Sequence, residues 1–287
     1  VALEFLAGGK RGLLRWLWSS WPREAGLAGL ARDGEEQEPE KRQSLIYRVP
    51  RRLYEELPSE DTAWRFRTCA VVGNSGVLLN KPYGAAIDRA DAIFRINNAP
   101  IEQFAPHCGS RTTFSIINQH HARSMAFEGV KSLHSKARLL VYESTYASVR
   151  LETYPRLLKQ YPGDALLMSP EIVVRGYTLW LQFKALVEKI NREVARGHSN
   201  GNPIRTSFKR KPMTGFFGVL FAIQICNNVK LYGFSGYNRY ENNGARRGKV
   251  PYHYFDSVPG ATQVHSFDLS LQVFKLMARV HNITMVD

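Results

Sequence analysis

The sequence contains few cysteines, and their number and spacing exclude two kinds of protein. Its 287 residues include only Cys69, Cys108 and Cys226, which are too few for a disulfide framework and form no C-x-x-C pair of a zinc or redox site. Buried free thiols in a cytosolic protein are the simplest interpretation. The glycosylation sequon Asn282-Ile283-Thr284 favours a secretory route instead.

Long apolar runs are also missing. No stretch reaches the roughly 18 apolar residues that a membrane-spanning helix needs. The nearest candidate, residues 13–21, is short and follows Lys10 and Arg11. We therefore expect the chain as given to be soluble. Because it begins at Val1 without an initiator methionine, an upstream anchor or signal could precede it.

Three motifs of nucleotide enzymes do not occur. The Gly-x-x-Gly pair at residues 73–76 is not a G-x-G-x-x-G dinucleotide fingerprint, and the absence of G-x-x-x-x-G-K-[ST] argues against an ATPase or a kinase. No Asp-x-Asp pair is present either, although many nucleotide-sugar transferases hold Mg²⁺ or Mn²⁺ through one. A sugar transferase with this sequence should use a leaving group that needs no metal, such as a nucleoside monophosphate.

Basic residues outnumber acidic ones by 39 to 25, which gives a net charge of +14. This excess favours an anionic partner, which could be nucleic acid, anionic lipid or a phosphorylated small molecule. The basic residues are scattered and no nucleic-acid recognition motif occurs, so we expect no nucleic-acid partner. With 44% hydrophobic residues the chain can bury the core of one large domain.

Two regions are expected, an N-terminal arm at residues 1–43 and a domain at 44–287. The aromatic stretch at 13–21 is interpreted as an amphipathic helix packed on the domain, with a membrane-surface anchor as the alternative. Acids and bases crowd residues 31–43, which is typical of a solvated linker.

Within the domain, apolar runs alternate with amphipathic segments. Strands are predicted at 69–72, 92–96, 139–142, 166–168 and 229–234, and helices at 83–90, 177–196 and 214–225. The polar, basic stretch 197–212 is predicted to be a surface loop. The alternation predicts an α/β domain with a mainly parallel central sheet flanked by helices.

Ligands of open α/β sheets bind beyond the carboxyl ends of the strands. The loops expected there read Gly73-Asn74-Ser75-Gly76, Asn97-Asn98 and Ser235-Gly236, and they offer amides, hydroxyls and small residues to ribose and phosphate oxygens. Thr214-Gly215 opens a helix, where free backbone N–H groups favour an anion. The alternative for Thr214 is a plain N-cap threonine.

Two histidines near the C-terminus, His253 and His265, are candidates for proton transfer. An imidazole with an ordinary pKa near 6.5 can accept a proton at neutral pH or hold one against a phosphate. Taken singly, each histidine could equally be structural, and six others occur in the chain.

Four segments resemble the sialylmotifs of eukaryotic sialyltransferases, in the family's order. Residues 69–113, with Gly73-Asn74-Ser75-Gly76 and Phe94-Arg95-Ile96-Asn97, resemble the large motif, and Pro212-Met213-Thr214-Gly215 through Gly236 resembles the small motif. His253-Tyr254-Phe255-Asp256 resembles the third motif, and His265 the histidine of the very small motif. The first 65 or so residues lie outside this resemblance.

The resemblance implies a single α/β domain, a Rossmann-like variant of the nucleotide-sugar transferase fold, in a type II membrane glycoprotein of the Golgi lumen. It implies a glycosyltransferase that uses a CMP-activated 2-keto-3-deoxy sugar acid as donor and a glycan hydroxyl as acceptor. Inversion at the anomeric carbon, with no metal or other cofactor, is implied as well. The membrane anchor would lie outside this chain.

The resemblance also implies roles for individual residues. His265 falls where the family has its catalytic base, and His253 where a histidine stabilises the phosphate. Donor contacts fall on Asn74, Ser75, Asn97, Thr214, Gly215, Ser235 and Gly236. The family's disulfide would join Cys69 to Cys226 and leave Cys108 free, which requires an oxidising compartment.

Three departures from the family's pattern bear on function. Met213 stands where most members have serine, and Ser270 stands where the very small motif has glutamate, for which Asp268 could substitute. These two changes motivate a second hypothesis, a non-catalytic CMP- or glycan-binding relative. Residues 114–119 lack the His-rich continuation of animal enzymes and look closer to plant and algal members, so Kdo is an alternative to sialic acid as the transferred sugar.

Overall fold

The computed structural model describes residues 63–134, 136–197, 211–235, 250–258, 260 and 264–287, together with residues 51 and 55 and the backbone of two short strands. These strands, β1 (Ala2–Leu6) and β2 (Ser44–Arg48), pair antiparallel. The predicted helix at 13–21, the predicted linker at 31–43 and most of the predicted loop at 197–212 lie outside the described residues. The boundary between arm and domain therefore stays a prediction.

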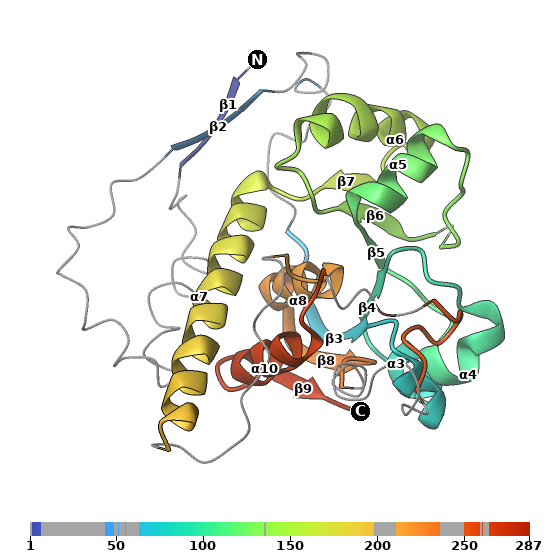
Figure 1. The fold of residues 1–287 in the computed structure, drawn as a ribbon. Coiled ribbons are helices and arrows are strands. Elements are labelled where there is room, and N and C mark those ends of the chain that lie inside the picture. Colours follow the sequence, from blue (N-terminus) through green and yellow to red (C-terminus); the bar gives the residue numbers. More distant parts are fainter. Residues whose placement is uncertain are drawn as a thin grey trace.

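The domain is built on one sheet of seven parallel strands, in the order β7-β6-β5-β4-β3-β8-β9 (Figure 1). The strands are β3 (Phe66–Val72), β4 (Ala92–Ile96), β5 (Phe114–Ile117), β6 (Arg138–Val141), β7 (Ala165–Leu167), β8 (Cys226–Tyr232) and β9 (Ile283–Met285). Every neighbouring pair in this sheet is parallel, which confirms the predicted fold class.

Helices cover both faces of this sheet. They are α3 (Gly84–Asp88), α4 (Ala105–Cys108), α5 (Gln119–Phe127), α6 (Tyr154–Gln160), α7 (Pro170–Ala195), α8 (Thr214–Ile225) and α10 (Phe267–Met277). The 3₁₀-helices η2 (Gly76–Asn80) and η3 (Glu102–Phe104) and the π-helix η4 (Val149–Thr153) complete the described elements. Figure 1 shows α7 along one side of the molecule and α3 and α4 on the other.

Side chains alternate between two cores because successive residues of a strand point to opposite faces. On β3, Cys69 and Val71 join the core under α7, α8 and α10, whereas Ala70 and Val72 join the core under α3 and α4. A third cluster packs the outer strands against α5 and α6. Since both faces are covered, the strands are apolar runs rather than alternating ones, as expected for a parallel sheet.

The predicted strands and helices agree with the structure to within a few residues, with one exception. Residues 92–96 coincide with β4, but the helix predicted at 177–196 begins at Pro170 instead. The proline occupies the first turn, where its missing N–H costs no hydrogen bond. Strands β1, β2, β5 and β9 and helices α4, α5, α6 and α10 are additional to the prediction.

The disulfide between Cys69 and Cys226 is present, as the resemblance implied. Cys69 lies within β3 and Cys226 begins the neighbouring strand β8, with 6.1 Å between their Cα atoms. Cys108 is buried and free, also as expected. The bond ties the α8–β8 segment to the centre of the sheet and closes a loop of 157 positions.

We predict that replacing both bridge cysteines, Cys69→Ala with Cys226→Ala, lowers the Tm by about 10–20 °C. Closing so long a loop stabilises a chain by about 5 kcal/mol in the chain-entropy model. Calorimetry measures the change, and Cys108→Ala is the control, for which a shift of only a few degrees is expected. A double variant that melts with the wild type would contradict the prediction.

A buried histidine joins the segment before β6 to the sheet. The His134 Nε2–H donates to the Ala99 carbonyl at 2.9 Å, and Nδ1 lies 3.3 Å from the Ser115 hydroxyl. The side chain is only 4% exposed, and burial is the main reason why its pKa falls to about 4. His134 therefore stays neutral in the folded protein at any pH above this value.

This burial predicts a loss of stability in mild acid. Below pH 6.5 the unfolded chain protonates His134 while the folded chain does not until about pH 4, so the free energy of unfolding falls across that window. Between pH 7.5 and 5.0 we expect a fall of about 2 kcal/mol from this residue. Urea unfolding at both values measures it; a His134→Gln variant with an equally steep pH dependence would exclude His134 as the cause.

Candidate active site

Polar residues follow three neighbouring strands at the same edge of the sheet. Asn74 lies two residues after β3, Asn97 directly follows β4, and Asn118 directly follows β5. The strands are parallel, so these positions meet beyond their carboxyl ends. A cavity of about 200 Å³ opens there, lined by Gly73, Asn74, Ile96, Asn97, Asn118, Met213, Thr214, Gly215, Phe234, Tyr252, His253 and His265.

Asn97 connects the elements around this cavity. It and Asn98 both adopt left-handed backbone angles, with φ of 54° and 56°, a conformation that asparagine tolerates better than most residues. The Asn97 Oδ1 accepts from the Asn118 backbone N–H at 3.1 Å, and its Nδ2 lies 3.5 Å from the Thr214 hydroxyl. One side chain thus joins the ends of two strands to the start of α8.

The N-terminus of α8 faces the cavity. Met213 occupies the N-cap position and its side chain makes no capping hydrogen bond, so Thr214 is the first helical residue and the alternative of an N-cap threonine is wrong. Backbone N–H groups at such an end, together with the helix dipole, favour an anion. Gly215 is required here because a Cβ would lie 2.9 Å from the ring of Phe234.

A second glycine allows the loops after β3 and β8 to meet. A Cβ on Gly73 would lie 2.6 Å from the Gly233 carbonyl oxygen, closer than carbon and oxygen approach without a bond. The Gly73 N–H also donates to the Tyr232 carbonyl at 2.8 Å. The two strand ends can therefore pack closely only with glycine at this position.

His265 enters the cavity just before α10. Its Nδ1 lies 3.1 Å from the Lys211 backbone carbonyl, which can only accept, so Nδ1 carries the proton and the lone pair of the neutral ring is on Nε2. Burial is the main cause that lowers the pKa of His265; the Lys211 ammonium lowers it further, while the Lys211 carbonyl and the Glu143 carboxylate oppose this. A neutral imidazole with a free lone pair is able to act as a base.

His253 enters from the segment after residue 250. Its Nδ1 lies 2.9 Å from the Asp256 carboxylate, and its ring stacks on Phe255 with 4.8 Å between the ring centres. The carboxylate accepts from Nδ1 and so fixes the tautomer and the direction of Nε2. Among the predicted donor contacts and catalytic residues, Asn74, Asn97, Thr214, Gly215, His253 and His265 are brought together around one cavity.

Two of the remaining predicted contacts, Ser75 and Ser235, do not line the cavity. Ser75 is fully buried, and its hydroxyl accepts from the Val77 N–H at the start of η2. The Ser235 hydroxyl donates to the carboxylate of Asp287 at 3.2 Å. Gly236 lies outside the described residues, so a donor contact from any of these three positions remains a prediction.

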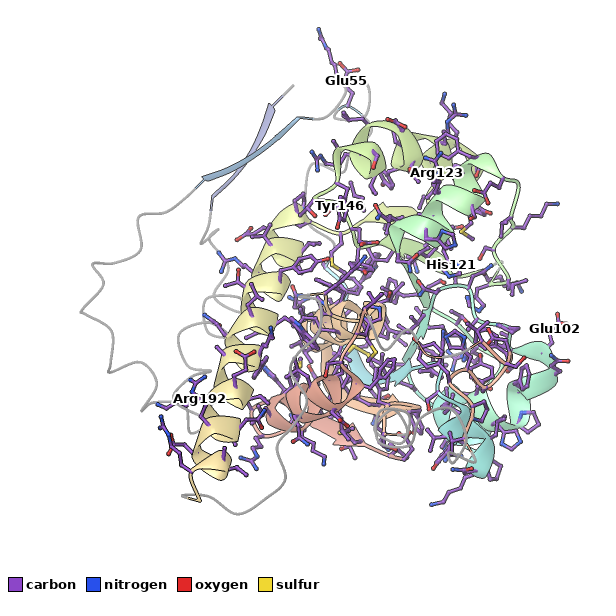
Figure 2. All side chains as sticks on the ribbon, in the orientation of Figure 1. Glu55, Glu102, His121, Arg123, Tyr146 and Arg192 are labelled. Atoms are coloured by element: carbon purple, nitrogen blue, oxygen red, sulfur yellow. A yellow bond between two sulfur atoms is a disulfide. The ribbon has the colours of Figure 1, made fainter. Side chains whose placement is uncertain are left out.

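Three residues at the site carried no predicted role. Asn118 lines the cavity and caps α5, where its Oδ1 accepts from the His121 N–H; the signal was a polar residue after a strand, but that strand had not been predicted. Tyr252 lines the cavity beside His253. His121, labelled in Figure 2, lies in the first turn of α5, and burial, with nearby His120 and His253, lowers its pKa.

In the described part of the chain, no group of three or more His, Cys, Asp or Glu side chains could hold a metal ion. No helix among the same residues is long and apolar enough to cross a membrane.

Ser270, the departure in the very small motif, is buried, and its hydroxyl donates to the Ser266 carbonyl at 2.7 Å within the first turn of α10.

Known proteins resemble this chain over most of its length. The sequence model of glycosyltransferase family 29 (sialyltransferase) matches residues 30–281. CMP-N-acetylneuraminate-beta-galactosamide-alpha-2,3-sialyltransferase 1 of Sus scrofa is 29% identical over 236 residues, which cover 76% of this chain and 57% of the relative. The mouse protein of that name is 29% identical over 229 residues, with coverages of 76% and 58%. The chain thus spans less than two thirds of these relatives.

Two solved structures are similar as well, a mammalian sialyltransferase alone and the complex of a mammalian sialyltransferase with Gal-beta-1-3GalNAc-ortho-nitrophenol. Each has a TM-score of 0.48 and 23% sequence identity, and the match covers 77% of this chain and 69% of the other. The family match extends over nearly nine tenths of the chain and includes every described cavity residue. The chain therefore belongs to glycosyltransferase family 29, the sialyltransferase family.

Proposed function

We propose that the protein transfers a sialic acid from a CMP-sugar donor to a glycan hydroxyl, with inversion and without a metal ion. The observation that carries this proposal is the convergence of an uncapped helix N-terminus and two oriented imidazoles on one cavity, in a chain of the sialyltransferase family. An anion site and a base are the two parts that displacement of a nucleoside monophosphate requires.

In this proposal the donor phosphate binds at the start of α8. The N–H groups of Thr214 and Gly215 are placed to donate to its oxygens, and the helix dipole stabilises its charge. His253, whose Nδ1–H is bonded to Asp256, donates from Nε2 to the phosphate as an imidazolium, with both ring nitrogens protonated, as CMP leaves with an additional negative charge. The amides of Asn74 and Asn97 face the same cavity and are assigned to the nucleotide.

His265 serves as the general base. Its Nε2 lone pair accepts the proton of the acceptor hydroxyl while that oxygen attacks the anomeric carbon and the bond to the CMP oxygen breaks. Attack on the face opposite to CMP inverts the configuration. The lowered pKa keeps His265 unprotonated near neutral pH, and a positioned base typically contributes about 10²–10⁴-fold to the rate.

Two alternatives differ in donor and in activity. The names of the relatives specify CMP-N-acetylneuraminate, which supports sialic acid. Transfer of Kdo from CMP-Kdo, motivated by residues 114–119, is the first alternative. A non-catalytic CMP- or glycan-binding relative, motivated by Met213 and Ser270, is the second.

We also propose a Golgi lumen location, with a type II membrane anchor outside the described residues. The Cys69–Cys226 disulfide supports an oxidising compartment. The sequon asparagine, Asn282, is exposed and so accessible to glycosylation.

Release of CMP tests the reaction and the donor together. We expect turnover with CMP-Neu5Ac and a galactoside acceptor, unchanged by EDTA and slower by tenfold or more with CMP-Kdo. The reverse ranking would establish the Kdo alternative. Binding of CMP by calorimetry with neither transfer nor hydrolysis, across a panel of glycans, would establish the non-catalytic one.

A single substitution tests the base. His265→Ala is expected to lower kcat by about 10²-fold or more, while the Kd for CMP changes by less than about threefold, because the base acts on the acceptor rather than on the nucleotide. His107→Ala is the matched control: this histidine contacts the Lys81 carbonyl away from the cavity, and its loss should leave kcat unchanged. Retained transfer in His265→Ala would remove His265 from this role.

A further inference from the structure

A fully buried carboxylate lies next to the candidate site. Glu143 follows β6 by two residues and has no exposed surface. Its Oε1 lies 2.8 Å from the Lys211 ammonium, and its Oε2 accepts from the Gln119 backbone N–H at 2.6 Å. One side chain therefore joins the segment before α8 to the start of α5, the two segments that contribute Met213 and Asn118 to the cavity.

This burial constrains where Lys211 can lie. An ionised carboxylate out of water costs several kcal/mol unless an opposite charge and hydrogen bonds compensate it. Glu143 has both: an ion pair with Lys211 and a hydrogen bond from the Gln119 N–H. The Lys211 side chain is 35% exposed. The need to neutralise Glu143 thus holds the backbone of Lys211 in place.

That backbone sets the direction of His265. The Lys211 carbonyl accepts from His265 Nδ1 at 3.1 Å, which leaves the Nε2 lone pair for the cavity. Ser270, in the first turn of α10, supplies no charge, and its hydroxyl donates to the Ser266 carbonyl. The carboxylate that acts on His265 is instead Glu143, two residues after the end of β6.

We propose that Glu143 and Lys211 form a positioning pair that holds His265 in the tautomer and direction of a base. This inference rests on the proposed function, in which His265 takes the acceptor's proton. Neither partner lines the cavity, so both act through His265 and neither is a catalytic residue.

The two charges act on His265 with opposite sign. Glu143, at the end of β6, favours the imidazolium and raises the pKa of His265, whereas the Lys211 ammonium, before α8, lowers it. Among the described residues, these two side-chain charges contribute most to the pKa of His265. Removing one or the other should therefore move the titration of His265 in opposite directions, a result that a general loosening of the fold would not produce.

The experiment compares Glu143→Gln and Lys211→Met with Glu171→Gln. The control removes the charge of a partly buried glutamate that pairs with Arg175 at 2.8 Å on α7. We expect kcat to fall about ten- to hundredfold in the first two variants, with the KM for donor changed by less than about threefold, because a misdirected base slows the chemical step. The control should keep the wild-type kcat.

Imidazole NMR of labelled protein, with His265→Gln for assignment, gives a readout that does not depend on turnover. The pKa of His265 is expected to fall in Glu143→Gln and to rise in Lys211→Met. If one of the two variants does not fold, as judged by circular dichroism, the titration of His265 in the other decides.

The outcomes separate this inference from the proposed function. Wild-type kcat and an unmoved His265 titration in both variants would overturn the positioning pair while leaving the transferase intact. Full transfer by His265→Ala would instead overturn the role of His265 as base. If no donor is turned over, opposite movements of the titration still support the pair, and an unmoved titration still overturns it.

Discussion

The candidate site depends on one constraint, the common direction of the strands. In a parallel sheet the carboxyl ends lie at one edge, so the residues after β3, β4, β5 and β6 must be close in space. Asn74, Asn97, Asn118 and Glu143 occupy these positions. The strands end just before these residues. The side chains of Asn97, Asn118 and Glu143 form hydrogen bonds with backbone N–H groups or side chains of the neighbouring segments.

Helix α8 completes the site. Because it has no polar face, it is buried against the sheet, and this burial fixes where its first turn lies. Its residues are apolar on nearly every side, and nine of the twelve are buried beneath the centre of the sheet. The strand that follows it is parallel to β3, so the helix runs back along the sheet and its first turn faces the strand ends. The Cys69–Cys226 bond fixes the other end of the same helix. The candidate anion site and the disulfide therefore lie at opposite ends of the same buried helix.

Local patterns predicted much of this architecture, and their failures have local causes. Residues 92–96, predicted from the alternation that ends in Phe94-Arg95-Ile96, coincide with β4, and Thr214-Gly215 does begin a helix. Strands β5 and β9 are as short as β6 and β7, but Ser115 and Thr284 interrupt their apolar runs, so neither was distinguished from a loop. Because β5 was missed, Asn118 was not recognised as a strand-end residue, although Asn97 was.

The sequence by itself determined the fold class, the start of the anion-binding helix and the two candidate imidazoles, because periodicity, turn residues and motif order are properties of neighbours along the chain. Only the tertiary structure decided which groups meet. Glu143 lies 68 residues from Lys211, and Lys211 lies 54 residues from His265. Contacts over such separations follow from the register of the whole sheet and from the cost of leaving a buried charge unpaired, and no local pattern encodes either.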